Sequence, residues 1–287
     1  MKIDDRFEKP PIIIGGCGRS GTSLLLSVLS ARPNIFAIPH ETKAFCPSAY
    51  SKNVNLNAPL KLARVAEILR AADIKKGVAR WCEKTPKNVL FIGRILAALD
   101  EDVRFINIVR DGRDVITSRH PKSHDQFYVG AERWITDVRA GLPFETHRQV
   151  LVIRYEDLVL KFQETLKMIC EFLEETVDEQ LLDWHSHTTI RHHPAWFDDV
   201  KQVHSHSIGR WQRPEYRDLV SRMMSDRDAI SLLKHYGYVS SDTKAVGAWK
   251  PRAVVRRCGR RIPANLKRAF ERCFSFATES GEAKRST

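Results

Sequence analysis

The chain has 287 residues, of which 43% are hydrophobic, and it carries a formal net charge of +12. This length predicts one large domain or a domain with an appendage, and the apolar fraction suffices for a sizeable core. The charged start of the sequence lacks the apolar run of a signal peptide, and no stretch is long and apolar enough to predict a transmembrane helix. The six cysteines show neither metal-ligand spacing nor a disulfide framework, so we expect a cytoplasmic protein.

The positive charge is concentrated near the end of the sequence. Residues 244–287 contain twelve Lys and Arg against three Asp and Glu, whereas the preceding residues are nearly balanced. A nucleic-acid-binding domain usually carries basic residues on its folded face, so we expect no nucleic acid partner. We expect a folded domain over residues 1–243 and a partly disordered basic extension over 244–287. Basic and apolar residues alternate in this extension, which favours contact with an anionic membrane surface or an acidic partner.

The first motif along the chain is a glycine-rich segment. Residues 16–23 read Gly-Cys-Gly-Arg-Ser-Gly-Thr-Ser and follow the apolar run at 12–14. A strand, a glycine turn and a helix in this order point backbone N–H groups and a helix N-terminus at an anion, which predicts a phosphate-binding loop. The spacing matches the Walker pattern, except that Thr22 replaces the lysine that reaches the β- and γ-phosphates of a nucleoside triphosphate. The loop therefore argues against an ATPase or kinase, and Arg19 places a positive charge inside it instead.

The other predicted elements alternate between strands and helices. The apolar patterns predict strands at 12–14, 103–109 and 149–153, and helices at 20–31, 60–72, 89–99 and 162–173. A further helix is expected to begin within 115–119, and 155–158 is expected to form a turn. This alternation predicts an α/β fold with a mostly parallel central sheet that helices cover on both faces. Such sheets bind ligands beyond the carboxyl ends of their strands, where the glycine loop lies.

The predicted strand at 103–109 ends at a second candidate anion site. Arg110 follows its last residue, and Ser118 lies eight positions later on the next predicted helix. A guanidinium offers a planar set of donors that suits phosphate, and a serine hydroxyl adds another donor. In the alternative interpretation, an Arg–Asp pair fixes the strand end and Asp114 caps the helix. Two anion sites at neighbouring strand ends favour one ligand that carries phosphate groups at two positions.

These motifs resemble those of the sulfotransferase family, whose sulfuryl donor is 3′-phosphoadenosine-5′-phosphosulfate (PAPS). Residues 19–23 resemble its 5′-phosphosulfate motif, and residues 108–115 with Ser118 resemble its 3′-phosphate motif. Three further segments resemble family motifs in the same order: Glu-Lys-Thr-Pro-Lys-Asn at 83–88, Arg-Tyr-Glu-Asp-Leu at 154–158 and Ser-Ile-Gly-Arg-Trp at 207–211. The resemblance covers roughly residues 10–240. It implies a P-loop-type three-layer sandwich and makes 1–243 a sulfotransferase domain.

The resemblance also implies a reaction and its residues. The enzyme would transfer the sulfuryl group of PAPS to a hydroxyl of a glycan, a tyrosine peptide or a lipid, with PAP (the desulfated nucleotide) as product and without a metal ion. Lys84 is implied to stabilise the leaving group, and Arg19 to assist in catalysis. The residues implied to bind the nucleotide are Gly18, Arg19, Ser20, Gly21, Thr22, Ser23, Arg110, Ser118, Tyr155, Ser207, Gly209, Arg210 and Trp211.

The general base has three candidates. In tyrosylprotein sulfotransferases a glutamate in a Glu-Thr-Arg stretch acts as the base, and Glu41-Thr42-Lys43 resembles this stretch with lysine in place of arginine. His40 and His120 are the alternatives, because many small-molecule sulfotransferases use a histidine. Glu41 would require a pKa raised by burial to act near neutral pH.

Two other functions are compatible with parts of the sequence. One is a P-loop kinase or another enzyme that uses a nucleoside triphosphate, although the loop lacks its lysine. The other is a non-catalytic adaptor of the same fold that recruits partners through the basic extension. The histidines between 185 and 206 do not form a recognisable ligand motif, so we expect no metal site there.

Overall fold

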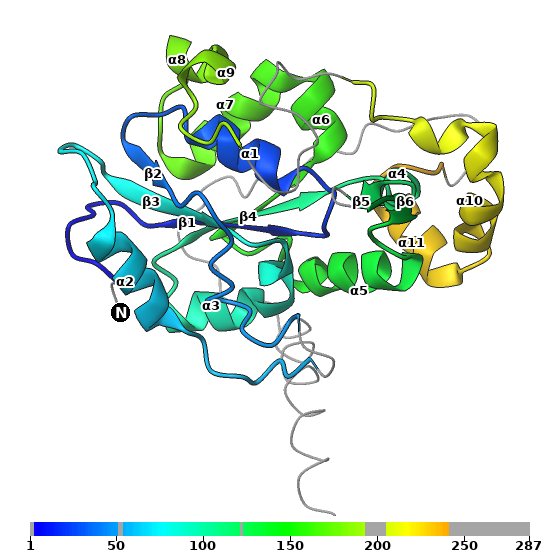
Figure 1. The fold of residues 1–287 in the computed structure, drawn as a ribbon, viewed down its shortest axis with the longest axis horizontal. Helices are drawn as coiled ribbons and strands as arrows, with labels where there is room; N and C mark the ends of the chain where they lie inside the picture. The colour runs from blue at the N-terminus through cyan, green and yellow to red at the C-terminus, as the bar shows by residue number, and fades with distance from the viewer. Residues whose placement is uncertain (1–2, 51–53, 121–122, 193–204, 241–287) are drawn as a thin grey trace, which may run out of the picture.

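A computed structural model describes residues 3–50, 54–120, 123–192 and 205–240 of the chain (Figure 1). Its centre is a five-stranded sheet in the order β2-β3-β1-β4-β7, in which every neighbouring pair is parallel. The strands are β1 (Ile12–Gly16), β2 (Ile35–Ala37), β3 (Arg80–Lys84), β4 (Arg104–Val109) and β7 (Val150–Arg154). The prediction of an α/β fold with a mostly parallel sheet is therefore confirmed.

Helices cover both faces of the sheet and make three layers (Figure 1). One face packs against α1 (Thr22–Leu29), α6 (Tyr155–Leu160) and α7 (Phe162–Leu173), and the other against α2 (Leu62–Ala71), α3 (Ile92–Ala98) and α5 (Ala131–Gly141). Successive strand residues point to opposite layers: Ile12 and Ile14 belong to the core of the first face and Ile13 to that of the second. All five residues of β1 are buried, as expected for a central parallel strand.

The remaining elements complete the described part of the chain. They are α4 (Gly112–Ile116), the antiparallel pair β5 (Arg119–His120) and β6 (Ser123–Phe127), α8 (Glu179–Leu182), α9 (Trp184–His187), α10 (Arg217–Met224), α11 (Arg227–His235), and the 3₁₀ turns η1 (Pro86–Phe91), η2 (Leu142–Phe144), η3 (Arg210–Gln212) and η4 (Pro214–Tyr216).

Three sequence-based predictions of elements were wrong. The helix expected within 115–119 begins at Gly112, because the Asp111 side chain accepts a hydrogen bond from the backbone N–H of Arg113 and caps it, and it ends before Ser118. Residues 155–158 lie in α6 rather than in a turn, and acidic residues in the first turn of α6 complement the helix dipole. The helix expected at 89–99 is divided into η1 and α3.

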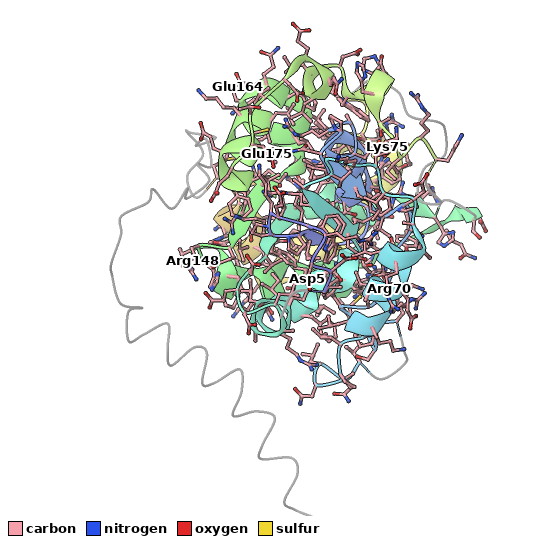
Figure 2. The ribbon with its side chains drawn as sticks, turned by 90° about the vertical axis from the view of Figure 1, so that its left-hand side faces the viewer. Asp5, Arg70, Lys75, Arg148, Glu164 and Glu175 are labelled. Carbon is pink, nitrogen blue, oxygen red and sulfur yellow. The ribbon has the colours of Figure 1, made fainter. Side chains whose placement is uncertain are left out.

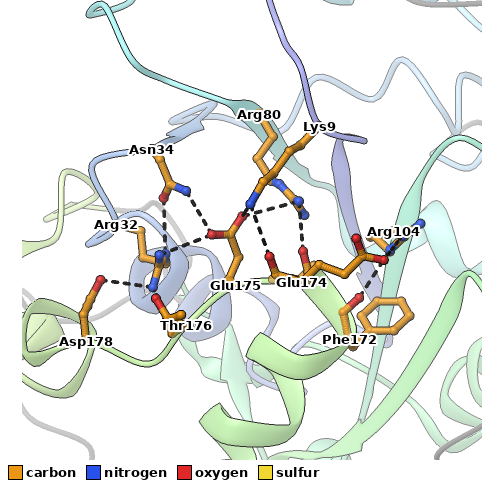
Figure 3. A network of polar contacts seen from close by, with 11 residues as sticks. Lys9, Arg32, Asn34, Arg80, Arg104, Phe172, Glu174, Glu175, Thr176 and Asp178 are labelled. Carbon is orange, nitrogen blue, oxygen red and sulfur yellow. Dashed lines mark hydrogen bonds and ion pairs between the residues drawn. The ribbon is translucent and has the colours of Figure 1, made fainter. Parts of the chain in front are cut away.

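A charged network joins the amino ends of the strands to the end of α7 (Figure 3). The Glu175 carboxylate lies 2.8 Å from Lys9 Nζ, 3.3 Å from Arg32 Nη2 and 3.4 Å from Arg80 Nη2. Arg80 is only 1% exposed, so its charge depends on this carboxylate for compensation. The network fixes the amino-terminal edge of the sheet, opposite to the edge where β1, β3 and β4 end.

Charged side chains such as Asp5, Arg70 and Lys75 stand on the outside of the molecule (Figure 2). Among the described residues, no helix has the length and apolar character needed to cross a bilayer. The basic extension at 244–287 lies outside the described residues, so its proposed membrane or acidic-partner contact and the domain boundary stay predictions.

Candidate functional site

The glycine-rich segment forms a tight turn between β1 and α1. Arg19 and Gly21 both adopt left-handed backbone conformations, with φ of 69° and 93°. A Cβ atom on Gly21 would lie 2.4 Å from Tyr155 Cδ2, so this position accepts only glycine. Gly21 also caps α1 without a side-chain hydrogen bond, which leaves the first N–H groups of this helix directed at the loop. The turn therefore has the local geometry of an anion site.

The hydroxyl residues of the loop are buried around this turn. Thr22 and Ser23 open α1 and are less than a tenth exposed. Ser20 is fully buried, and within the described part of the chain its Oγ has no hydrogen-bond partner. An orphaned buried hydroxyl calls for an explanation, and a ligand in the turn supplies one. A Cβ on Gly18 would lie 3.0 Å from Arg133 Nη2, so this arginine packs closely against the loop.

Arg110 connects the end of β4 to this turn. Its Nη1 donates to the backbone carbonyl of Arg19 at 3.0 Å, and its guanidinium carbon lies 4.3 Å from the centre of the Tyr155 ring. The side chain also donates to the Ser207 carbonyl, and the Ser207 Oγ lies 2.8 Å from the Tyr155 hydroxyl. Arg110 is 5% exposed, and no described residue accepts a hydrogen bond from its Nε. The structure thus brings the two predicted anion sites together.

Three arginines meet at this place. Burial, together with the positive charges of Arg110 and Arg210, lowers the pKa of Arg19 to about 10. Burial and the charge of Arg110 likewise lower the pKa of Arg210. Like charges gathered in a partly buried place repel one another unless an anion lies between them. The cluster is therefore suited to a multiply charged anion.

The segment that carries Arg210 packs against α4. Arg210 Nη2 donates to Ser118 Oγ at 2.7 Å, although Ser118 follows α4 instead of lying on a helix. The backbone N–H groups of Gly209 and Trp211 donate to the Asp114 carboxylate at 2.8 and 3.1 Å. The prediction of Asp114 as a helix cap was wrong, because Asp111 caps α4, and these hydrogen bonds of Asp114 were not predicted. The Trp211 ring lies 3.8 Å from the Arg113 guanidinium carbon.

Lys84 and Glu41 form an ion pair beside the glycine-rich turn. Lys84 ends β3 in register with Ile14 of β1, and its side chain is fully buried. Its Nζ lies 2.8 Å from Glu41 Oε1, and the Tyr50 hydroxyl lies 3.4 Å from Glu41 Oε2. Burial lowers the pKa of Lys84, and the Glu41 carboxylate opposes this change. The pair places a cation and a carboxylate at the same sheet edge as the three arginines.

A second carboxylate, Glu83, holds this pair in place and was not among the predicted site residues. It is fully buried, and its Oε1 accepts hydrogen bonds from Thr42 N at 3.2 Å, Thr42 Oγ1 at 2.9 Å and Thr85 Oγ1 at 2.6 Å. Its Oε2 accepts from Asn88 Nδ2 at 2.8 Å. Its position at the start of the Glu-Lys-Thr-Pro-Lys-Asn segment at 83–88 was the signal that could have identified it. Glu83 ties the segment after Glu41 to β3.

The two alternative bases lie elsewhere in the site region. His40 is exposed, and the His120 ring contacts that of Tyr128 at 5.1 Å between centroids. Glu41 is the candidate that the structure pairs with Lys84. In the described ranges, no group of three or more His, Cys, Asp or Glu residues is arranged to hold a metal ion.

Comparisons with known proteins agree with this geometry. The chain is 22% identical to the protein-tyrosine sulfotransferase of Drosophila melanogaster over 276 residues, which cover 81% of this chain and about half (53%) of that protein. The sulfotransferase domain of the Synechococcus PCC 7002 olefin synthase superposes with a TM-score of 0.53 at 19% identity, covering 83% of this chain and 98% of that domain. The sulfotransferase domain of the curacin biosynthetic pathway gives 0.50 at 18% identity, covering 76% and 98%. A model of the sulfotransferase family matches residues 10–179, more than half of the chain, so this chain belongs to the sulfotransferase family.

Proposed function

We propose that this chain transfers the sulfuryl group of PAPS to an acceptor hydroxyl and releases PAP. The observation that carries the proposal is the hydrogen bond from Arg110 to the Arg19 carbonyl, which brings the ends of β4 and β1 together. Lys84 ends β3 on the other side of β1, so the donors lie at three adjacent strand ends. One nucleotide with phosphates at its 3′ and 5′ positions matches this spread of positive charge.

The residues present fit such a nucleotide. The turn at 18–23 offers backbone N–H groups, the start of α1 and the unpartnered Ser20 hydroxyl to the 5′-phosphosulfate. Arg110, Ser118 and Arg210 supply donors for the 3′-phosphate at the end of β4. Thr22 stands where a kinase has its lysine, which supports a donor other than a nucleoside triphosphate.

PAPS, when bound, supplies an activated sulfuryl group: a bond forms between the acceptor oxygen and sulfur while the bond from sulfur to the bridging oxygen breaks. Lys84 donates a proton or hydrogen bond to that bridging oxygen as negative charge develops there. A preorganised cation shielded from water contributes several kcal/mol to such a step. Lys84 meets this requirement because its side chain is fully buried and held by Glu41.

Glu41 acts as the general base in this proposal. Its carboxylate is part-exposed, so it remains accessible to an acceptor while it contacts Lys84. A base in hydrogen-bond reach of the acceptor hydroxyl removes its proton as the new bond forms. Glu41→Gln keeps the shape but cannot take the proton, so kcat is expected to fall by about 10²- to 10⁴-fold. Retention of the wild-type kcat by Glu41→Gln would assign the base elsewhere, with His120→Asn as the next variant.

We further propose a tyrosine side chain in an acidic peptide as the acceptor. Basic and aromatic residues surround Glu41 and Gly18: Lys43 Nζ lies 4.7 Å from the centre of the Tyr50 ring, and the Arg133 guanidinium carbon lies 5.3 Å from that of Tyr128. Rings stack on an aromatic acceptor and the cations attract acidic neighbours. The similarity to the protein-tyrosine sulfotransferase of Drosophila melanogaster supports the same acceptor.

The test is incubation of the protein with ³⁵S-labelled PAPS and, in separate reactions, an acidic tyrosine peptide, a glycan panel and a lipid extract. Label is expected on the peptide with the wild type and to be lost with Arg19→Ala and Lys84→Ala. Lys75→Ala, which changes an exposed lysine, is the matched control and keeps wild-type activity. Label on a glycan or lipid instead would replace the acceptor assignment. Equal transfer by all variants would overturn the mechanism, and phosphate transfer from γ-labelled ATP would favour a kinase.

A further inference from the structure

The buried carboxylate of Asp114 binds the backbone of the segment at 205–212, which carries Arg210. Asp114 lies on α4 and is 1% exposed. Its Oδ2 accepts the backbone N–H of Gly209 at 2.8 Å, and its Oδ1 accepts that of Trp211 at 3.1 Å. Both oxygens are thus bound to the residues on either side of Arg210. A carboxylate has two acceptor oxygens and can take one such bond at each of them, whereas a side-chain amide has a single acceptor oxygen.

The backbone carbonyl of Asp114 also binds the side chain of Arg210. Its carbonyl oxygen accepts from Arg210 Nη2 at 3.0 Å and from Ser118 Oγ at 2.9 Å. Arg210 Nη2 in turn donates to Ser118 Oγ at 2.7 Å. One residue therefore holds the backbone and the guanidinium of Arg210, together with the serine beside it.

The local charge excludes direct ligand binding as the role of this carboxylate. Burial raises the pKa of Asp114, whereas the positive charge of Arg110 and the two backbone hydrogen bonds lower it. A negative charge beneath Arg110 and Arg210 weakens the attraction of both for an anion. On charge alone, an anion site is better without it, so its contribution must be geometric.

We infer that Asp114 is a positioning residue for the 3′-phosphate: its carboxylate holds the turn at Gly209 and Trp211 so that Arg210 reaches the phosphate beside Ser118 and Arg110. This inference rests on the proposed function. Gly209 adopts φ of 73°, a left-handed conformation that the two hydrogen bonds stabilise. Asp114 touches no ligand in this account and acts through Arg210.

Asp114→Asn separates the geometric role from the electrostatic one, because the two roles predict opposite changes in the affinity for PAP. An amide has one acceptor oxygen, so one of the two backbone N–H groups loses its partner and meets another donor. Positioning then predicts that PAP binds at least about tenfold more weakly, in line with the loss of one buried hydrogen bond. Removal of a negative charge alone predicts tighter binding.

The experiment is calorimetric titration of the full chain with PAP and with adenosine 5′-monophosphate, which lacks the 3′-phosphate. Asp114→Asn is expected to weaken the binding of PAP and to change the affinity for the monophosphate by less than about threefold. In a double-mutant cycle, Asp114→Asn is expected to have little further effect in an Arg210→Ala background, because it acts through that arginine. Gly209→Ala is the second variant: its Cβ meets no atom closer than 3.8 Å, so it strains the turn without a clash and is expected to weaken PAP selectively.

Several results would overturn the inference. They are PAP binding that is unchanged or tighter in Asp114→Asn, equal weakening of both nucleotides, or additive effects with Arg210→Ala. If Asp114→Asn fails to fold, Gly209→Ala serves as the test. The inference is then contradicted if Gly209→Ala keeps the wild-type ratio of affinities for PAP and adenosine 5′-monophosphate. Failure of the wild type to bind PAP would instead reject the proposed function itself, so the two failures are distinguishable.

Discussion

The guanidinium of Arg110 donates a hydrogen bond to the backbone carbonyl of Arg19 at 3.0 Å. The two residues follow different strands, β4 and β1, which are neighbours in the sheet. The contact uses the carbonyl of a residue in a left-handed conformation, so the shape of the turn and the position of Arg110 depend on each other. Changes in either motif are therefore expected to affect both ends of the proposed nucleotide.

Substitution of Gly21 tests the shape of the turn. In Gly21→Ala the new Cβ meets Tyr155 Cδ2 at 2.4 Å, and we expect PAP affinity to fall more than about tenfold together with a loss of stability of about 1–3 kcal/mol. Gly77→Ala is a close control, because Gly77 has nearly the same φ, 91°, with no atom within 4 Å of an added Cβ. It is expected to lose stability but keep PAP affinity, measured by calorimetry. Equal affinity losses in the two variants would show that the turn has no special role.

Lys84 gives a prediction about pH. Burial lowers its pKa below the ordinary 10.5, so the side chain loses its proton at a lower pH than an exposed lysine does. Because the proposed chemistry needs the charged form, kcat is expected to fall as pH rises through this lowered pKa. Lys84→Ala is expected to reduce kcat by about 10²- to 10³-fold and to leave PAP affinity within about threefold of the wild type. A kcat of Lys84→Ala close to that of the wild type would remove this lysine from the mechanism.

The fall of kcat at high pH, which is the alkaline limb of the pH profile, is tested with Lys84→Arg, whose guanidinium keeps its charge over the accessible pH range. Any activity that remains in this variant is expected to persist at high pH. An unchanged alkaline limb in Lys84→Arg would assign that limb to another group.

The hydrogen bonds of Glu83 to Thr42 predict a difference between two small substitutions. Thr42→Val removes the hydroxyl that Glu83 accepts at 2.9 Å, whereas Thr42→Ser retains it. We expect kcat to fall at least about fivefold in Thr42→Val through displacement of Glu41, and Thr42→Ser to stay close to the wild type. The KM for PAPS is expected to be unchanged in both. A rise in this KM without a change in kcat would mean that Glu83 supports nucleotide binding and not the catalytic pair.

The sequence could predict the fold class and the donor motifs because short-range patterns carry both. The apolar run at 12–14 and the glycines after it mark a strand and a turn, and the structure has both. The contacts of Asp114 and Glu83 could not be predicted, because Gly209 and Thr42 are far from them along the chain. The helix α6 was missed because its short Tyr-Glu-Asp-Leu start lacks helical periodicity and depends on packing of Tyr155 and Leu158 against the sheet core.

The network around Glu175 predicts a change in stability without a change in function. Glu175→Gln removes the carboxylate that lies 3.4 Å from the buried Arg80, and we expect unfolding to become easier by about 3 kcal/mol. Burial raises the pKa of Glu175, but hydrogen bonds from Lys9 and Asn34 outweigh it and hold this pKa below the ordinary 4.5. The stabilisation is therefore present above pH 4.5 and is lost as pH falls through the lowered pKa.

Urea unfolding measures this stability, with Glu164→Gln on the exposed side of α7 as control. The control is expected to match the wild type, and PAP affinity is expected to be unchanged in both variants. Equal stability of Glu175→Gln and Glu164→Gln would contradict a structural role for the network.

The most direct test of the central claim is calorimetric titration of the wild-type chain with PAP and, separately, with ATP and Mg²⁺. If Arg19, Arg110 and Arg210 bind one adenosine bisphosphate, PAP is expected to bind with a stoichiometry of one and at least about tenfold more tightly than ATP with Mg²⁺. Arg110→Ala is expected to reduce this preference. Tighter binding of ATP with Mg²⁺, or PAP binding that Arg110→Ala does not change, would contradict the account.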